Sequence, residues 1–184
     1  MKKLFLASLL LLVITPNIGV ANEASIKNEL SAKLSQLVEL MKDPYAEEYE
    51  KARGIAILKM GNSENEEHTL VVAVAVFTIE SFALGNNYTQ FMAVFANLSE
   101  DSEGHPQRLS FLDVKAVGGK GIRGVEFNKI KLNLSKDGKI LITVPTLEYG
   151  SKDPMCCPSI KSSIKYSIEP SVGGRLKEVK RGMS

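Results

Sequence analysis

The stretch LVVAVAVFTIESF, residues 70–82, is an almost unbroken apolar run that is rich in valine. A run of this length and composition predicts a central β-strand that is buried on both of its faces. A glycine and two asparagines follow at 85–87 and mark a turn, because both residue types tolerate a positive φ. A second apolar segment, residues 88–96, comes next, so we expect the two segments to pair as a β-hairpin.

Shorter strand segments surround this hairpin. Strands are expected at residues 55–60, 108–117, 125–134, 140–144, 162–168 and 175–179. The charged stretch 64–68, the acidic stretch 98–107 and the glycine-rich stretch 118–124 are expected to be loops, and Lys136-Asp137-Gly138 a tight turn. Within 125–134 the alternation changes phase, which a bulge near Asn128 would reconcile. Connections this short favour antiparallel hairpins, because parallel strands need long crossovers.

The residues before the strands read as a helix. Apolar residues recur at spacings of three and four over residues 22–41, with Ser25 as the expected N-cap. The Asp43-Pro44 pair is expected to end this helix, and residues 47–53 to add a short second one. A helix followed by a meander of hairpins predicts an α+β fold, with an N-terminal helix packed on a mainly antiparallel, hairpin-connected sheet. We expect one mature domain, residues 22–184, with the helical part at 22–53 and the sheet at 54–180.

The first 21 residues have the three parts of a secretory signal. Lys2 and Lys3 precede an apolar run at 4–15, Pro16 breaks it, and Gly19-Val20-Ala21 offers small residues for cleavage. The apolar run is shorter than the roughly 18 residues that a membrane-spanning helix needs. The sequence therefore predicts a signal peptide cleaved after Ala21, a periplasmic or secreted protein, and no transmembrane anchor in the mature chain.

The charge balance bears on the class of partner. Removal of residues 1–21 takes two lysines from the 23 basic residues and leaves 21 against 21 acidic ones. Nucleic-acid binding needs a concentrated basic surface to neutralise phosphates, so we expect no nucleic-acid partner. The chain has no tryptophan, and no large aromatic binding platform is indicated. The expected partner is an unknown envelope protein or a small ligand.

No familiar catalytic pattern stands in the sequence. His68 and His105 lie in polar stretches without a metal-ligand partner at a recognised spacing. The Gly118-Gly119-Lys120-Gly121 segment lacks the second half of a phosphate-binding loop, and no G-x-S-x-G elbow occurs. We therefore expect no catalytic residues and no cofactor, and a non-enzymatic role is favoured.

One chemically unusual segment remains, DPMCCPS at residues 153–159, which holds the only two cysteines. The Cα atoms of neighbouring residues lie about 3.8 Å apart, whereas the Cα atoms of the two cysteines in an ordinary disulfide lie about 4.4 to 6.8 Å apart. Four interpretations stay open: a vicinal disulfide that shapes the loop, two reduced and buried thiols, a soft-metal site with Met155, for example for copper(I), or a disulfide between molecules. The candidate site residues are Asp153, Met155, Cys156, Cys157 and Pro158.

This segment resembles a motif, Asp-x-Met-Cys-Cys-Pro-Ser/Thr, near the C-terminus of bacterial exported proteins and lipoproteins such as the mycobacterial LppP/LprE type. Weaker similarity extends over residues 70–168, through the turn and strand at 86–95 and the strand entry at 122–130. The chain departs from the commoner form at 64–72 and at Ile122, where aspartate is usual. The resemblance implies export and a domain of unknown function, and it carries over no catalytic residues.

Two functional hypotheses follow. The first is a non-enzymatic binding or structural domain of the cell envelope, with residues 153–159 as a rigid surface element. The second is a thiol-redox or soft-metal-binding protein that acts through Cys156 and Cys157.

Overall fold

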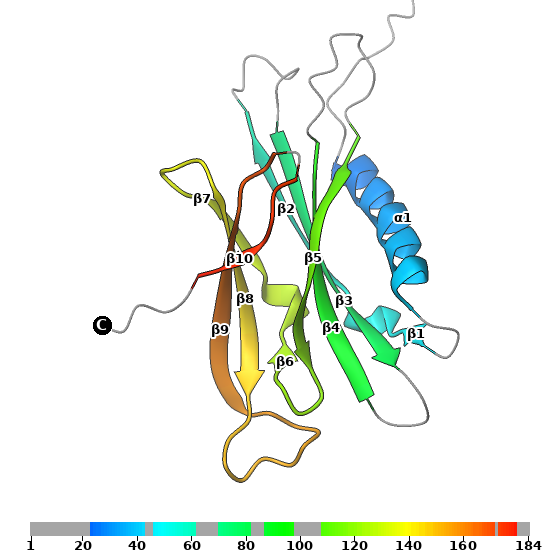
Figure 1. The fold of residues 1–184 in the computed structure, drawn as a ribbon, viewed down its shortest axis with the longest axis vertical. Helices are drawn as coiled ribbons and strands as arrows, with labels where there is room; N and C mark the ends of the chain where they lie inside the picture. Colours follow the sequence, from blue (N-terminus) through cyan, green and yellow to red (C-terminus); the bar gives the residue numbers. More distant parts are fainter. Residues whose placement is uncertain are drawn as a thin grey trace, which may run out of the picture.

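A computed structural model describes residues 23–42, 46–61, 70–81, 87–97, 108–171 and 173–179 (Figure 1). The predicted signal peptide, the predicted loops at 64–68 and 98–107 with both histidines, and the turn residues at 85 and 86 lie outside these residues.

The first of two five-stranded sheets contains the hairpin that the valine-rich run predicts. Its strand order is β1-β3-β4-β5, with β2 also paired to β3. β3 and β4 pair from Val72 opposite Ala96 to Ser81 opposite Asn87, which confirms the hairpin. The strands are β1 (Glu47–Glu48), β2 (Gly54–Met60), β3 (Leu70–Ser81), β4 (Asn87–Ala96) and β5 (Ser110–Gly119).

The second sheet is built from the C-terminal third of the chain. Its strand order is β10-β9-β8-β6, with β7 also paired to β8. All strand pairs of both sheets are antiparallel among the described residues. The strands are β6 (Gly124–Val125), β7 (Lys131–Leu134), β8 (Ile140–Glu148), β9 (Ile160–Ile168) and β10 (Lys177–Glu178).

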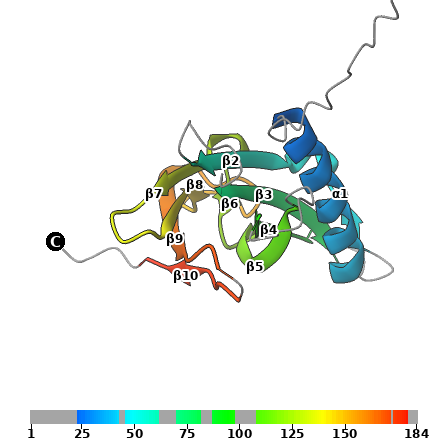
Figure 2. The ribbon, with the colours of Figure 1, turned by 90° about the horizontal axis from the view of Figure 1, so that it is seen from above.

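The molecule has three layers, with the first sheet in the middle (Figure 2). Helix α1 (Glu23–Met41) covers one face of this sheet, and the second sheet covers the other. Alternate residues of β3 point to opposite layers, because side chains alternate along a strand. Val72, Val74 and Val76 lie in the core between the sheets, and Val71, Ala73, Ala75 and Phe77 lie in the core under the helix.

This arrangement explains why residues 70–77 show no polar face. The helix contributes Ile26, Leu30, Leu34 and Val38 to the core between itself and the first sheet, at the spacing predicted from the sequence. The α+β class, with the helix on a mainly antiparallel sheet, is confirmed. Within the described residues, no helix has the length and apolar character needed to cross a bilayer.

Two local predictions in the helical part are corrected. Ser25 lies inside α1, which already includes Glu23, so it is not the N-cap. Within residues 47–53, the predicted second helix is confined to a short 3-10 helix, η1 (Glu50–Ala52), because Glu47 and Glu48 form a strand that pairs with the edge of β3. The edge of β3 offers backbone hydrogen bonds there, and these favour an extended chain over a short helix.

Two predictions in the strand region are also corrected. The phase change in 125–134 comes from a 3-10 turn, η3 (Phe127–Lys129), between β6 and β7, and not from a bulge. Gly118 and Gly119 belong to β5 and not to the following loop. The turn predicted at Lys136-Asp137-Gly138 is confirmed, with Gly138 at φ 78°.

Candidate functional site

The five candidate residues lie in one loop, residues 149–159, which joins β8 to β9 (Figure 1). The two strands pair without a shift from Ile140 opposite Ile168 to Glu148 opposite Ile160. This long hairpin holds both ends of the loop in place. The turn between β5 and β6 lies at the same end of the molecule as this loop (Figure 1).

Asp153 is the centre of the loop. Its Oδ2 accepts hydrogen bonds of 2.8 Å from the backbone amides of Gly150 and Ser159. The Ser159 hydroxyl donates to the same carboxylate at 2.9 Å. The Gly150 amide and then the Ser159 hydroxyl hold the pKa of Asp153 below its ordinary value of 3.8. Its negative charge therefore stabilises the loop from within.

Tyr149 ties the loop to the neighbouring turn. Its hydroxyl donates to the carbonyl of Met155 at 2.6 Å and accepts from the amide of Gly121 at 3.2 Å. Sequence reasoning missed this residue, since nothing in the local pattern indicates a partner 28 positions earlier in the chain. Close by, burial raises the pKa of the Tyr88 hydroxyl, and the neighbouring Tyr149 adds to the rise.

The cysteines form a vicinal disulfide, the first of the four interpretations. Cys156 and Cys157 are bonded to each other with their Cα atoms 3.8 Å apart. Both side chains are exposed, so they are not the buried packing thiols of the second interpretation. The Cys157 amide donates to the carbonyl of Pro154 at 3.0 Å, which makes the segment a tight turn.

Side-chain packing also fixes the loop against the β5–β6 turn. The Pro158 ring carbon lies 3.3 Å from the position that a Cβ would take on Gly124. The terminal methyl carbon of Met155 lies 3.7 Å from the corresponding position on Gly121. The approach of Pro158 is the tighter of the two, so the absence of a side chain at Gly124 helps the loop to pack there.

Three large apolar side chains are exposed in this loop and in the chain segments next to it. Met155 is 68% exposed, Ile122 of the neighbouring turn 62%, and Ile160 at the start of β9 52%. We call these three residues and the Cys156–Cys157 disulfide the loop surface. The sequence analysis found the cysteines and Met155 but not Ile122 or Ile160, because only the fold brings these to the same end of the molecule.

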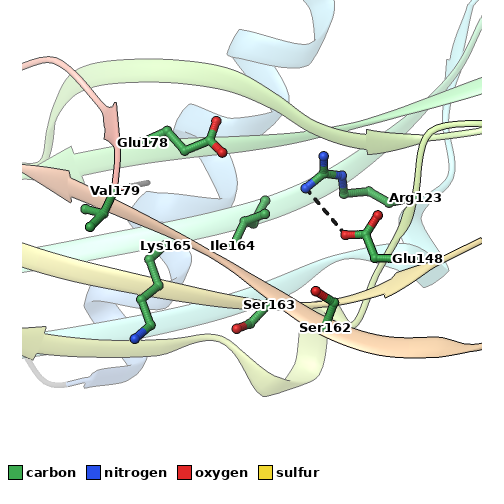
Figure 3. A pocket seen from close by; sticks show the side chains of 8 residues that line it. All are labelled: Arg123, Glu148, Ser162, Ser163, Ile164, Lys165, Glu178 and Val179. Atoms are coloured by element: carbon green, nitrogen blue, oxygen red, sulfur yellow. Dashed lines mark ion pairs between the residues drawn. The ribbon is translucent and has the colours of Figure 1, made fainter. Parts of the chain in front are cut away.

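A shallow depression of about 300 Å³ lies beside the loop surface, along β9 and β10 (Figure 3). Two of its lining residues, Arg123 and Glu148, form an ion pair, with Nη1 and Oε1 3.6 Å apart. Its other lining residues are Ser162, Ser163, Ile164, Lys165, Glu178 and Val179. The lining mixes both signs of charge.

A buried tyrosine lies deeper in the same region of β9. Burial raises the pKa of Tyr166, the nearby Glu178 raises it further, and Arg123 opposes the rise. Lys115 of β5 lies 5.6 Å from the centre of the Tyr166 ring, a cation–π contact between the two sheets.

No group of three or more histidine, cysteine, aspartate or glutamate side chains that could hold a metal ion occurs in the described parts of the chain. A soft metal would have to use Cys156, Cys157 and Met155, and the two cysteine sulfurs are bonded to each other. Metal binding at this loop would therefore require prior reduction to thiolates.

No protein-family model matches the chain, and neither a curated protein nor a solved structure is significantly similar to it. The geometry of the loop surface is thus the main basis for a functional interpretation.

Proposed function

We propose that this protein is an exported, non-enzymatic binding domain of the cell envelope and that the loop surface is its recognition element. The observation that carries the proposal is a tightly held loop that exposes large apolar groups. Met155 remains 68% exposed although its carbonyl is hydrogen-bonded to Tyr149 and its side chain lies beside Gly121. Exposed apolar side chains that gather in one region are typical of interaction sites, and these three belong to the loop, the neighbouring turn and the start of β9.

The order of the loop supports binding for an energetic reason. Ordering a flexible loop on association costs roughly 0.5 to 1.5 kcal/mol for each side chain that is immobilised. Here the Asp153 carboxylate, the Tyr149 hydroxyl and the disulfide set the shape before any partner arrives. A partner would meet a surface that is already formed.

The chemistry of the loop favours binding over catalysis. Its only carboxylate, Asp153, accepts hydrogen bonds from two amides and a hydroxyl inside the loop. The cysteines are held as a disulfide and offer no free thiolate. Export rests on the signal pattern of residues 1–21, and an oxidising compartment is where such a disulfide persists.

Site-directed photo-crosslinking in cells that export the protein tests the proposal. One variant carries the photoreactive residue in place of Met155, and the matched control carries it in place of Leu134, which is 55% exposed in the β7–β8 hairpin. We expect a discrete adduct from the Met155 position that Ile122→Asp weakens, and none from the Leu134 position. Equal adducts at both positions, or none at either, would contradict the proposal.

The exposure of the disulfide favours a second candidate function, that of a thiol-redox protein. In a related form of this candidate, Cys156 and Cys157 bind a soft metal ion once they are reduced. A thiolate of a dithiol donor would attack one sulfur, form a mixed disulfide and release the other cysteine as a thiol. The donor's second thiol would then close its own disulfide and leave Cys156 and Cys157 reduced by two electrons.

Thiol titration separates the two candidates. Protein purified from the exporting host is treated with a mild dithiol, and its free thiols and bound metal are measured. The binding proposal predicts a disulfide that persists and no bound metal. Rapid reduction to two thiols, with copper(I) retained afterwards, would support the second candidate.

A further inference from the structure

We propose that the outer face of the second sheet is a docking surface for an acidic segment of a protein partner. This sheet is an outer layer of the molecule, and its outer face is the one turned away from the first sheet (Figure 2). The face is distinct from the loop surface, so the inference goes beyond the proposed function.

The strand register decides which side chains lie on the outer face. Even-numbered residues of β8 and β9, such as Ile142 and Ile164, belong to the core between the sheets. Side chains alternate along a strand, so the odd-numbered residues point outward. On β8 and β9 these are Leu141, Thr143, Pro145, Leu147, Lys161, Ser163, Lys165 and Ser167. Lys131 of β7 lies opposite Thr143 and Lys177 of β10 opposite Ser167, so both share this face.

Four exposed lysines therefore gather on one face although they come from three strands. They are Lys131, Lys161, Lys165 and Lys177. Neighbouring strands lie about 4.8 Å apart, so Lys131 and Lys165, which are separated by one strand, have their backbones roughly 10 Å from each other. None of the four forms an ion pair with a described residue. Their charges are available to a partner.

No carboxylate stands among the outward residues of the described strands of this sheet. Glu148 and Glu178 occupy positions opposite Ile160 and Tyr166, on the inner side of the sheet. Lys165 points away from both of these glutamates (Figure 3).

The carboxylates beyond the strand ends are matched by another lysine. In the β7–β8 hairpin, Asp137 pairs with Lys139 at 2.6 Å. Glu169, just after β9, also raises the pKa of Lys139. The outer face itself is thus positive, and a positive patch favours a partner of the opposite charge.

The apolar part of the face favours a polypeptide as this partner. Leu141, Pro145 and Leu147 form a row along β8, between the lysines of β7 and those of β9. Protein interfaces combine such an apolar centre with a polar rim. The outward residues include no aromatic ring on which a nucleic-acid base could stack. A segment with apolar side chains between carboxylates complements this face.

Binding of a synthetic peptide tests the inference with protein purified from the exporting host. The probe is a soluble, fluorescently labelled peptide of glutamate and leucine, and the matched peptide has glutamine in place of glutamate. We expect the acidic peptide to bind, to bind more weakly at high salt, and to bind far more tightly than the glutamine peptide. Fluorescence anisotropy measures both.

Lysine variants with a matched control locate the contact. The double variant Lys161→Gln with Lys165→Gln should weaken binding about tenfold. The double variant Lys51→Gln with Lys59→Gln removes the same charge from exposed lysines of η1 and β2 and should leave binding unchanged. Circular dichroism of each variant checks that the fold is intact.

Other polyanions decide whether the partner is a polypeptide. Polygalacturonate, duplex DNA and vesicles of phosphatidylglycerol are compared at the same salt concentration. Preference for the acidic peptide, lost in the Lys161 and Lys165 variant alone, supports the inference. Equal or tighter binding of another polyanion, no binding of the acidic peptide, or equal effects of the two double variants overturns it.

The crosslinking experiment at Met155 is independent of this one. If the peptide does not bind while the Met155 position forms its adduct, the inference about the outer face fails and the proposed function stands. If the peptide binds as expected while no adduct forms at Met155, the proposed function fails and the inference stands.

Discussion

Asp153 shows how a single side chain can organise a loop. Its carboxylate collects two backbone amides and one hydroxyl from residues on both sides of the cysteines. These bonds form fully only when the carboxylate is ionised, since a protonated acid loses acceptor capacity. The residue was selected from the sequence for its place beside the cysteines, and the structure gives it the central position in the loop.

Acid should loosen the loop. The pKa of Asp153 is lower in the folded protein than its ordinary value of 3.8, because the Gly150 amide and the Ser159 hydroxyl favour the ionised form. A lowered folded pKa gives stability that is present above the unfolded value and is lost as the pH falls through the folded one. Amide exchange at Gly150 and Ser159, corrected for its intrinsic pH dependence, should therefore lose protection below pH 3.8.

The variant Asp153→Ala serves as the control for this prediction. Its Gly150 and Ser159 amides should exchange faster than in the wild type at neutral pH and show no further change on acidification. Protection that stays the same in the variant would show that the carboxylate does not order the loop.

Gly54 is a second residue that the fold requires. A Cβ there would lie 2.0 Å from the carbonyl oxygen of Phe127, a backbone atom of η3. Gly54→Ala should therefore lower the free energy of unfolding by about 1 to 3 kcal/mol or more through overpacking. Urea denaturation measures the change, and a variant as stable as the wild type would contradict this close approach of β2 and η3.

At the scale of elements, helix α1 is held by one apolar face. Leu30 and Leu34 are fully buried against the first sheet, while Leu40 is 85% exposed. The helix has few other ties to the sheet among the described residues: the Glu29 carboxylate accepts from the amide of Leu109, and the Ser31 hydroxyl from Arg53. Packing of apolar side chains must supply most of its stability.

Leu34→Ala should accordingly destabilise the protein by about 2 to 5 kcal/mol, because it leaves a cavity between α1 and the sheet. Leu40→Ala is the matched control and should change stability by less than about 0.5 kcal/mol. Thermal or urea unfolding measures both variants. A similar effect of the two substitutions would show that the helix is not docked by this face.

Elements with strong local periodicity could be predicted from the sequence. The two-sided apolar run of β3 and the three-and-four spacing of α1 each indicate one structure, and both are confirmed. Residues 47–53 and 127–129 could not be predicted, because their form depends on the edge of β3 and on the close approach to Gly54. Tertiary contacts override weak local preferences in segments this short.

In the candidate site, too, some residues could be predicted from the sequence and others could not. The adjacent cysteines can be recognised from the sequence alone, and DPMCCPS lies in the loop that joins β8 to β9. Tyr149, Ile122 and Ile160 could not be recognised, because their roles arise from the pairing of β8 with β9 and from the turn that follows β5. A local sequence motif can thus indicate a candidate site, but the residues that come from other segments are found only once the strand topology is known.

For the whole molecule, the three layers share the first sheet. Each face of β3 contributes to a different core, so loss of the sheet would expose both. The Lys115–Tyr166 contact and the bond from the Leu176 amide to the Asp113 carboxylate, 2.8 Å long, also join the two sheets. This sharing argues for one folding unit.

Unfolding should therefore occur in one cooperative step. Near-ultraviolet circular dichroism follows the tyrosines of both sheets, such as Tyr88 and Tyr166, and far-ultraviolet circular dichroism follows the backbone. Both signals should change at the same temperature if the helix and both sheets unfold together. Two separated transitions would show that the second sheet is an independent unit.

In the exporting cell, we expect a partner in the cell envelope to cover the loop surface. Met155 is itself a probe, because an exposed methionine is readily oxidised to its sulfoxide whereas a covered one is protected. The measurement is the rate of Met155 oxidation by dilute peroxide, read by mass spectrometry, in purified protein and in intact exporting cells. Met60, which is partly buried away from the loop, is the internal reference.

We predict fast oxidation of Met155 in the purified protein and marked slowing in cells relative to Met60. The same relative rate in both samples would mean that nothing covers the loop surface, and it would contradict the proposed function.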